Sequence, residues 1–290
     1  MISAGAEFDP SMTPAEMRAA AAARPVSNPP DVASVQVIDA EGVTCRLYHP
    51  LDGEDAPPLV VYFHGGGWVL QFTDGHATTA RHLANKSGCA VMAVDYRLAP
   101  EHPFPAAYDD SWAATVWAFD NLEALGCRRG PIGLTGDSAG GNLAAAVALR
   151  AIDSDVEVAS VALVYPSVDH RPKDYDSYRR YADAPILNSA LMARFGALYK
   201  GEADPADWRL SPLSAPDVGG LPPTMVVAAE IDPLFSEGLA WSERLQASDV
   251  DATHHTIPGT FHAFFGFVDE LEESRQAQAL IAGHLARLSA

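Results

Sequence analysis

The sequence predicts an α/β fold in which a mainly parallel, twisted sheet carries helices on both faces. The first supporting observation is that apolar segments of strand length alternate along the chain with longer segments of helical pattern. The second is that segment 59–63 is apolar at every position, which is typical of a strand buried on both faces. The third is size, because 290 residues with 48% hydrophobic side chains suffice for a large interior.

The expected elements follow one another in a regular order, and the first two strands are expected to be antiparallel. The strand candidates are 34–39, 43–49, 59–63, 90–95, 131–135, 160–165, 224–229 and 252–257. The helix candidates are 77–86, 105–125, 138–151, 236–248 and 272–288. This alternation of strand and helix is what predicts the parallel sheet.

Segment 169–212 interrupts this alternation with more than forty residues, and connections of this length are usually functional. It is rich in tyrosine and leucine, and Leu187, Leu191, Phe195 and Leu198 have the spacing of one helix face. We expect a helical cap whose apolar side, including Leu187, Leu191 and Phe195, lines a substrate pocket. The alternative is that this stripe serves only the core.

Ser138 lies between two glycines, directly after a strand candidate and directly before a helical segment. The segment Gly136-Asp137-Ser138-Ala139-Gly140 matches G-x-S-x-G, a sharp strand-to-helix turn that exposes the serine hydroxyl. A side chain two positions before or after the serine would collide with neighbouring backbone, so both positions require glycine. The pattern favours a nucleophilic serine, although a helix N-cap or a Gly/Ser-rich loop would also fit these residues.

A second glycine cluster, His64-Gly65-Gly66-Gly67-Trp68, follows the strand candidate 59–63. Successive glycines let backbone amides approach a ligand closely. In an acyl-transfer enzyme such amides hold the negative oxygen of the tetrahedral intermediate, and each is worth about two to three orders of magnitude in rate. A phosphate-binding loop is the alternative, but neither the Walker ending nor a dinucleotide-binding glycine pattern is present. Together the two glycine motifs predict an ester or amide hydrolase.

A nucleophilic serine needs a general base, and the base needs an acid that orients it. With this type of serine turn the three residues follow in the order Ser, Asp/Glu, His. Asp232 follows strand candidate 224–229 and precedes a proline, so we predict that it is the acid, with Glu230 as the alternative. His262 follows strand candidate 252–257 and a Pro-Gly-Thr turn, and we predict that it is the base. The alternative for His262 is a loop histidine packed among aromatic side chains.

The sequence contains no metal-binding pattern, since H-E-x-x-H is missing and the cysteines are isolated. We therefore predict no metal site, and the predicted chemistry requires no cofactor.

Five segments, in this order, carry a resemblance to a known family: HGGGW at 64–68, DYRLAPEHPFPAA at 95–107, GDSAGG at 136–141, DPL at 232–234 and FHAF at 261–264. They resemble the hormone-sensitive-lipase-like carboxylesterases, bacterial family IV of the α/β-hydrolase superfamily, and the match extends from about Thr13 to the C-terminus. The sequence departs from the family pattern at Ser236, where an acid is common. The N-terminal arm is also short, which we expect to leave the pocket more open.

The resemblance implies an α/β-hydrolase fold and a serine esterase that works through an acyl-enzyme intermediate. It implies that the catalytic residues are Ser138, Asp232 and His262. It implies that the oxyanion hole is formed by the amides of Gly66, Gly67 and Ala139.

In terms of domains, we expect residues 1–30 to be an N-terminal arm that contributes to the cap. Residues 31–290 are expected to form the catalytic domain, with the cap inserted at about 169–212. Short-chain acyl esters are the expected substrates, because each buried CH₂ gains about 0.8 kcal/mol only until a capped pocket is full. Two alternatives stay open: an amide or carbamate hydrolase with the same three residues, and a noncatalytic small-molecule receptor, which three intact residues disfavour.

Composition limits the partners. The net charge of −19, from 38 acidic and 19 basic residues, opposes binding to nucleic acid and to anionic membranes, and only three of the basic residues are lysines. The N-terminus lacks the features of a signal peptide, and no run of 18 apolar residues occurs. Because three scattered cysteines also fit a reducing compartment, we expect a cytoplasmic enzyme. Its expected partner is a small-molecule ester, and the sequence leaves open a homodimer.

Overall fold

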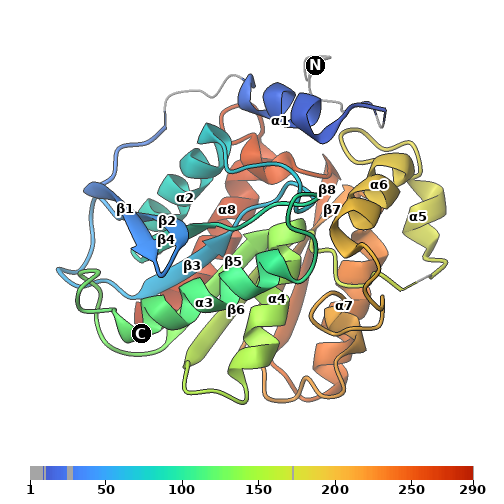
Figure 1. Ribbon diagram of the computed structural model, residues 1–290. Coiled ribbons are helices and arrows are strands. Elements are labelled where there is room, and N and C mark those ends of the chain that lie inside the picture. The colour runs from blue at the N-terminus through green and yellow to red at the C-terminus, as the bar shows by residue number, and fades with distance from the viewer. Residues whose placement is uncertain (1–8, 10, 25–28, 172, 290) are drawn as a thin grey trace.

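The computed structural model describes residues 9, 11–24, 29–171 and 173–289 and is built around one eight-stranded sheet (Figure 1). The spatial order of the strands is β1-β2-β4-β3-β5-β6-β7-β8. The strands are β1 (Ser34–Ala40), β2 (Val43–His49), β3 (Leu59–Phe63), β4 (Ala90–Asp95), β5 (Ile132–Asp137), β6 (Val158–Val164), β7 (Thr224–Ile231) and β8 (Ala252–Phe261). β1 and β2 are antiparallel, β2 and β4 are antiparallel, and all other pairs are parallel. The predicted fold class is confirmed.

Helices cover both faces of this sheet. The helices are α1 (Pro14–Ala22), α2 (Asp74–Ser87), α3 (Ala106–Asp120), α4 (Ala139–Ala151), α5 (Asp176–Arg180), α6 (Ser189–Lys200), α7 (Phe235–Ala247) and α8 (Glu272–Leu285). α3, α4 and α7 bury their apolar sides in one core, and α2 and α8 bury theirs in a second core on the other face. Strand β3 divides its side chains between them, with Val61 and Phe63 in the first core and Val60 and Tyr62 in the second. A strand between two cores must be apolar throughout, as its sequence is.

Helix α1 lies over the carboxyl ends of the strands, at the top of Figure 1. It begins with a capping box in which Thr13 and Glu16 bond each other's backbone amides. The Arg18 guanidinium then fixes the helix to the body of the protein. It donates to the carbonyl oxygens of Val69 and Ala99, each at 2.8 Å, and pairs with Glu101 at 2.6 Å. Helix α1 is therefore held in place by long-range contacts.

Several predicted element boundaries are wrong. The helix predicted at 105–125 ends at Asp120 as α3. Leu187 does not lie on the helix of the 169–212 segment, because the side chain of Asn188 accepts the amide of Leu191 and α6 starts only after this cap. The buried stripe of α6 is Leu191, Phe195 and Tyr199, in steps of four residues, while Leu198 is only partly buried.

The last strand is also longer than predicted, because β8 continues to Phe261 instead of ending at 257. Pro258 and Gly259 do not turn the chain away. The β7–β8 register shifts between Ala229 and Ile231, which lets pairing resume between Ile231 and Phe261.

The topology places one crevice at the centre of the sheet. From β3 the chain crosses to β4 on one side, and it then returns to form β5 on the other side of β3. Ligands of open parallel sheets bind outside the carboxyl ends of the strands where the order reverses in this way. The glycine segment 64–68 and Ser138 follow these two neighbouring strands directly. Within the described residues, no helix has the length and apolar character needed to cross a membrane.

Candidate active site

Ser138 occupies the sharp turn between β5 and α4 with φ 56° and ψ −117°, in the left-handed region that is unfavourable for most side chains. The flanking glycines make this turn sterically feasible. A Cβ at Gly136 would overlap the carbonyl oxygen of Gly140, and a Cβ at Gly140 would overlap that of Phe63. Both positions therefore require glycine, as predicted. The amide of Ser138 also donates to Val164 at 2.9 Å, which fixes the turn to β6.

The structure brings Ser138, His262 and Asp232 into one hydrogen-bonded chain. His262 Nε2 lies 2.8 Å from Ser138 Oγ, and His262 Nδ1 lies 2.7 Å from Asp232 Oδ2. In a neutral imidazole with its proton on Nδ1, Nδ1 donates to the carboxylate and Nε2 accepts the serine proton. The sheet register explains the second contact, because Ile231 pairs with Phe261 and the next residues of the two strands are Asp232 and His262.

Asp232 and Glu230 differ in what they contact. Asp232 is fully buried, and its second oxygen accepts the amide of Leu234 at 2.9 Å. Glu230 lies within β7, is exposed, and accepts the amide of Gly259 at 2.7 Å. The structure thus brings Asp232, the predicted acid, to His262 and places the alternative elsewhere. The ring of Tyr165 packs on His262 at 4.6 Å between centroids, which further fixes the imidazole.

The glycine segment after β3 forms a tight turn beside Ser138. The amides of Val69 and Leu70 both donate to the carbonyl oxygen of Gly66, whose φ of 125° only glycine adopts easily. Gly67 has φ 62°, and a Cβ there would overlap the ring of Phe195, so α6 packs directly on this backbone. Ala139 faces the same pocket as the first residue of α4, where helix amides lack intrahelical acceptors and the helix dipole is positive.

His64 fixes the start of this turn. Its ring stacks on Tyr96 at 4.4 Å between centroids, and the hydroxyl of Tyr96 donates to the carbonyl oxygen of His64 at 2.6 Å. Burial lowers the pKa of His64 to about 4, so the ring is neutral, and its Nδ1 lies 2.8 Å from the Gly65 carbonyl oxygen. A neutral, stacked imidazole thus keeps the glycine turn rigid without adding charge to the site.

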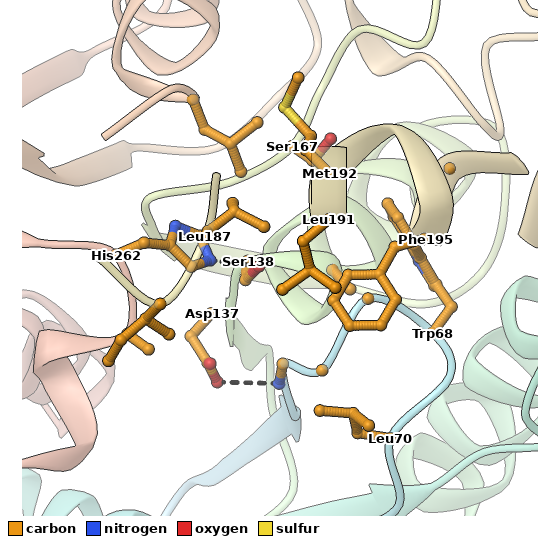
Figure 2. Close-up of a pocket in the computed structure, with 18 of the residues that line it drawn as sticks. Trp68, Leu70, Asp137, Ser138, Ser167, Leu187, Leu191, Met192, Phe195 and His262 are labelled. Carbon is orange, nitrogen blue, oxygen red and sulfur yellow. Dashed lines mark hydrogen bonds between the residues drawn. The ribbon is translucent and has the colours of Figure 1, made fainter. Parts of the chain in front are cut away.

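Asp137, which the sequence argument treated as a variable position of the motif, is a functional residue that it missed. Its Oδ1 accepts the amide of Gly65 at 3.1 Å, marked by the dashed line in Figure 2, and the hydroxyl of Tyr62 at 2.7 Å. It therefore links the serine turn to the glycine turn. Burial raises the pKa of Asp137, an effect that these two hydrogen bonds oppose. An acid at the end of an otherwise apolar strand is the signal that could have identified it.

A pocket of about 490 Å³ opens over these residues. Ser138, His262, Gly66, Gly67 and Ala139 all line it, and so do the predicted pocket residues Leu187, Leu191 and Phe195. Figure 2 shows Ser138 with His262 on one side and Leu191 and Phe195 on the other. Ala21 of α1 and Arg24, which follows this helix, also line the pocket.

Glu237 of α7 is a second residue that the sequence argument missed. It is buried, and its Oε2 accepts the amides of Val168 at 2.7 Å and Asp169 at 2.9 Å. Its Oε1 accepts the hydroxyl of Tyr178. Burial raises the pKa of Glu237 to about 8. The residue ties the helix that follows Asp232 to the 169–212 segment, and nothing in the sequence distinguishes it from a surface glutamate.

Among the described residues, no group of three or more His, Cys, Asp or Glu side chains is arranged to hold a metal ion.

Comparison with known proteins gives a consistent result. The family described as alpha/beta hydrolase fold matches residues 60–266. Esterase LipI of Mycobacterium tuberculosis is 38% identical over 239 residues, covering 80% of this chain and 74% of that protein. The arylesterase of Saccharolobus solfataricus is 38% identical over 242 residues, covering 83% of this chain and 78% of that protein.

Solved structures agree. The thermophilic carboxylesterase EstE1, cloned from a metagenomic library, superimposes with a TM-score of 0.88 at 34% identity, covering 97% of this chain and 99% of that one. A hyperthermophilic esterase from Pyrobaculum calidifontis gives a TM-score of 0.84 at 40% identity, covering 89% of this chain and 87% of that one. The resemblance to the hormone-sensitive-lipase-like carboxylesterases is thereby confirmed. The chain belongs to the alpha/beta hydrolase fold family.

Proposed function

We propose that the protein is a serine carboxylic ester hydrolase in which Ser138 is the nucleophile, His262 the general base and Asp232 the residue that orients His262. The observation that carries the proposal is the hydrogen-bonded chain of 2.8 Å and 2.7 Å that joins the three side chains, of which Ser138 and His262 line the pocket. The names of the relatives, which include esterases, a carboxylesterase and an ethyl acetate hydrolase, support the same reaction.

The reaction proceeds in two halves. Ser138 Oγ attacks the ester carbonyl carbon while His262 Nε2 takes the hydroxyl proton, and buried Asp232 stabilises the resulting imidazolium. His262 then gives this proton to the leaving alkoxide, so that an alcohol departs and an acyl-serine ester remains. In the second half His262 takes a proton from water, the hydroxide attacks the acyl carbon, and the proton returns to Ser138 as the carboxylic acid leaves.

The negative oxygen that forms in each half needs hydrogen-bond donors. We propose that these are the backbone amides of Gly66, Gly67 and Ala139, which line the pocket beside Ser138. Preorganised amides contribute to rate because they need no rearrangement as charge develops. The rigid glycine turn and the start of α4 provide such amides from two different elements.

The pocket favours small acyl groups. Leu187, Leu191 and Phe195 limit the space above Ser138, and each enclosed CH₂ adds about 0.8 kcal/mol only until that space is filled. We propose that residues 1–30 and 169–212 form a cap, of which residues 1–8, 10, 25–28 and 172 lie outside the described residues. We propose further that esters of about two to six acyl carbons are hydrolysed best. Substitution of Leu191 or Phe195 should shift this optimum.

The test is a panel of 4-nitrophenyl esters from two to sixteen acyl carbons, with a 4-nitroanilide beside it. We expect kcat/KM to peak at a short chain and the anilide to be a poor substrate. Ser138→Ala should lose at least about a thousandfold in kcat with an unchanged melting temperature, because the hydroxyl carries chemistry and little packing. Retention of more than about a tenth of the activity would exclude Ser138 as nucleophile. Values of kcat/KM that still rise at sixteen carbons would indicate a lipase.

A further inference from the structure

The charged residues around the pocket have the opposite sign to the molecule as a whole. The chain carries a net charge of −19 and has only three lysines, Lys86, Lys173 and Lys200. Two of these three, Lys173 and Lys200, line the pocket above Ser138. Arg24 and Arg171 line it too, so four of the 19 basic residues surround this one opening.

The acidic residues that line the same pocket are buried and already hydrogen-bonded or ion-paired within the protein. Asp137 accepts the bonds from Tyr62 and Gly65 described above. Asp169 is buried, and it pairs with Arg171 at 2.7 Å. Glu237 accepts two backbone amides, and burial raises its pKa to about 8, so it is largely protonated at neutral pH. Each pocket-lining carboxylate is thus withdrawn from solvent.

The two lysines, in contrast, reach solvent. Lys173 is exposed and Lys200 is half-buried. Lys200 lies on the face of α6 that lines the pocket, because Met192, Gly196 and Lys200 are spaced by four residues and all three contribute to the pocket wall. The charged groups that a substrate meets at this rim are therefore basic.

The rim lies at some distance from the reacting serine. Leu191 lines the pocket together with Ser138, and Lys200 follows it nine positions later, which is roughly 13 Å along a helix. The ring of Tyr199, the residue before Lys200, lies 6.4 Å from the ring of His170, so this end of α6 is near the chain segment that also carries Arg171 and Lys173. The basic side chains thus gather from α6 and from the segment after β6 at one end of the pocket.

From this arrangement we propose that the pocket binds esters whose acyl or alcohol part ends in an anionic group, such as a carboxylate, and that Lys200 and Lys173 attract that group. The proposal rests on the ester hydrolysis proposed above and names its substrate class. At physiological ionic strength charges are screened within about 8 Å, so the nearby ammonium groups outweigh the distant acidic surface for a bound substrate.

The test compares matched pairs of esters that differ only by the anionic group. For the acyl side the pair is monoethyl adipate and ethyl hexanoate, and for the alcohol side it is 4-acetoxybenzoate and phenyl acetate. The quantity measured is the ratio of kcat/KM for the anionic ester to kcat/KM for its neutral partner. The pair whose ratio depends on the lysines shows which part of the substrate faces them.

Charge substitutions then probe the lysines one at a time. We expect Lys200→Gln or Lys173→Gln to lower the ratio about threefold, and Lys200→Glu or Lys173→Glu to lower it about tenfold, as for partly exposed ion pairs. Sodium chloride at 0.5 M should lower the wild-type ratio to a similar extent. Lys86→Glu is the matched control, because it makes the same change in net charge on α2, away from the pocket.

Ratios that respond neither to the pocket lysines nor to salt, while neutral esters are still hydrolysed, would overturn this inference and leave the proposed function intact. An equal fall in Lys86→Glu would also overturn it, because the effect would then belong to the total charge. Failure of the wild type to hydrolyse any of the four esters would instead refute the proposed function. Circular dichroism of each variant confirms that the comparison is made between folded proteins.

Discussion

Asp232 and Glu230 stand two residues apart at the end of β7, and only Asp232 contacts His262. In Asp232→Asn the amide group would present a donor to His262 Nδ1 and favour the wrong tautomer, so Nε2 could no longer accept the serine proton. We expect kcat to fall by about ten-thousandfold, as it does when the corresponding aspartate of a serine protease is replaced by asparagine. Glu230→Gln is the control, and we expect it to change kcat little. A larger loss in Glu230→Gln than in Asp232→Asn would reassign the acid.

Asp137 acts through another residue, because it holds the amide of Gly65 and thereby the turn that carries Gly66 and Gly67. Asp137→Asn keeps an oxygen that can accept from Gly65 and from Tyr62, so we expect nearly wild-type kinetics. Asp137→Ala removes this acceptor, and a displacement of the turn by about 1 Å costs about a hundredfold in rate. We expect that loss in kcat, with little change in KM.

Steady-state kinetics of both Asp137 variants, together with their melting temperatures, separate positioning from simple loss of stability. If Asp137→Asn lost as much kcat as Asp137→Ala, the charge of Asp137 would be the important property. We would then conclude that Asp137 does not act by holding the glycine turn in position.

The contact between α7 and the segment after β6 depends on the protonation of Glu237. Burial raises the pKa of this carboxyl from its usual 4.5 to about 8. Between pH 4.5 and pH 8 the Glu237 carboxyl is ionised in the unfolded chain, whereas in the folded protein it is still protonated. This group therefore contributes stability that is present below pH 4.5 and is lost as the pH rises towards 8.

We expect Glu237→Gln to remove the contribution of this group, because a glutamine oxygen can accept the two backbone amides and the side chain has no proton to lose. The melting temperature of the wild type relative to Glu237→Gln should therefore fall from pH 5 to pH 8, since all other titrating groups are common to both proteins. Glu243→Gln, an exposed position on the same helix, is the matched control. An unchanged pH dependence in Glu237→Gln would show that Glu237 does not carry it.

For the whole molecule, buried histidines set the stability at low pH. Burial lowers the pKa of both His64 and His170 to about 4. Between pH 6.5 and pH 4 these two histidines are protonated in the unfolded chain but remain neutral in the folded protein. Stability therefore falls as the pH drops from 6.5 towards 4, by about 1.4 kcal/mol per pH unit for each such histidine.

Thermal unfolding between pH 4 and pH 6.5, in buffers of equal ionic strength, checks this expectation. We expect the melting temperature to fall steadily across the range as the solution is acidified. A melting temperature that stays level or rises on acidification would show that these rings are not held neutral in the folded protein.

The sheet was predictable from sequence because its signals are local. Each buried strand is an apolar run between turn residues, and all eight were located within a few residues of their observed positions. The sharp turn at Ser138 was equally predictable, since the two glycines around Ser138 reflect a steric need within five residues. That Asp232 and His262 lie together followed from their places after β7 and β8.

Features that depend on distant contacts were not predictable. The extension of β8 to Phe261 depends on pairing with Ile231, whereas Pro258 and Gly259 indicate a turn when only neighbours are considered. The position of α1 over the pocket depends on the bonds of Arg18 to Val69 and Ala99, more than fifty residues away. Glu237 resembles an ordinary polar position until the elements that bury it are assembled. For Asp137 the sequence shows only an acid at the end of a strand, and its bond to Gly65 depends on the pairing of β3 with β5.

β8, which ends directly before His262, is also the last strand of the sheet and has a neighbour on one side only. His262 and Ser138 are 124 residues apart in the sequence, so their contact exists only while this edge stays paired. Proteins open locally at a lower free energy than that of global unfolding, and a strand with one neighbour has fewer backbone hydrogen bonds to break than an interior strand. Fraying of β8 would therefore abolish turnover while the interior strands keep their amides protected from hydrogen exchange. Ester hydrolysis thus reports the integrity of this one edge more sensitively than spectra that average over the whole chain.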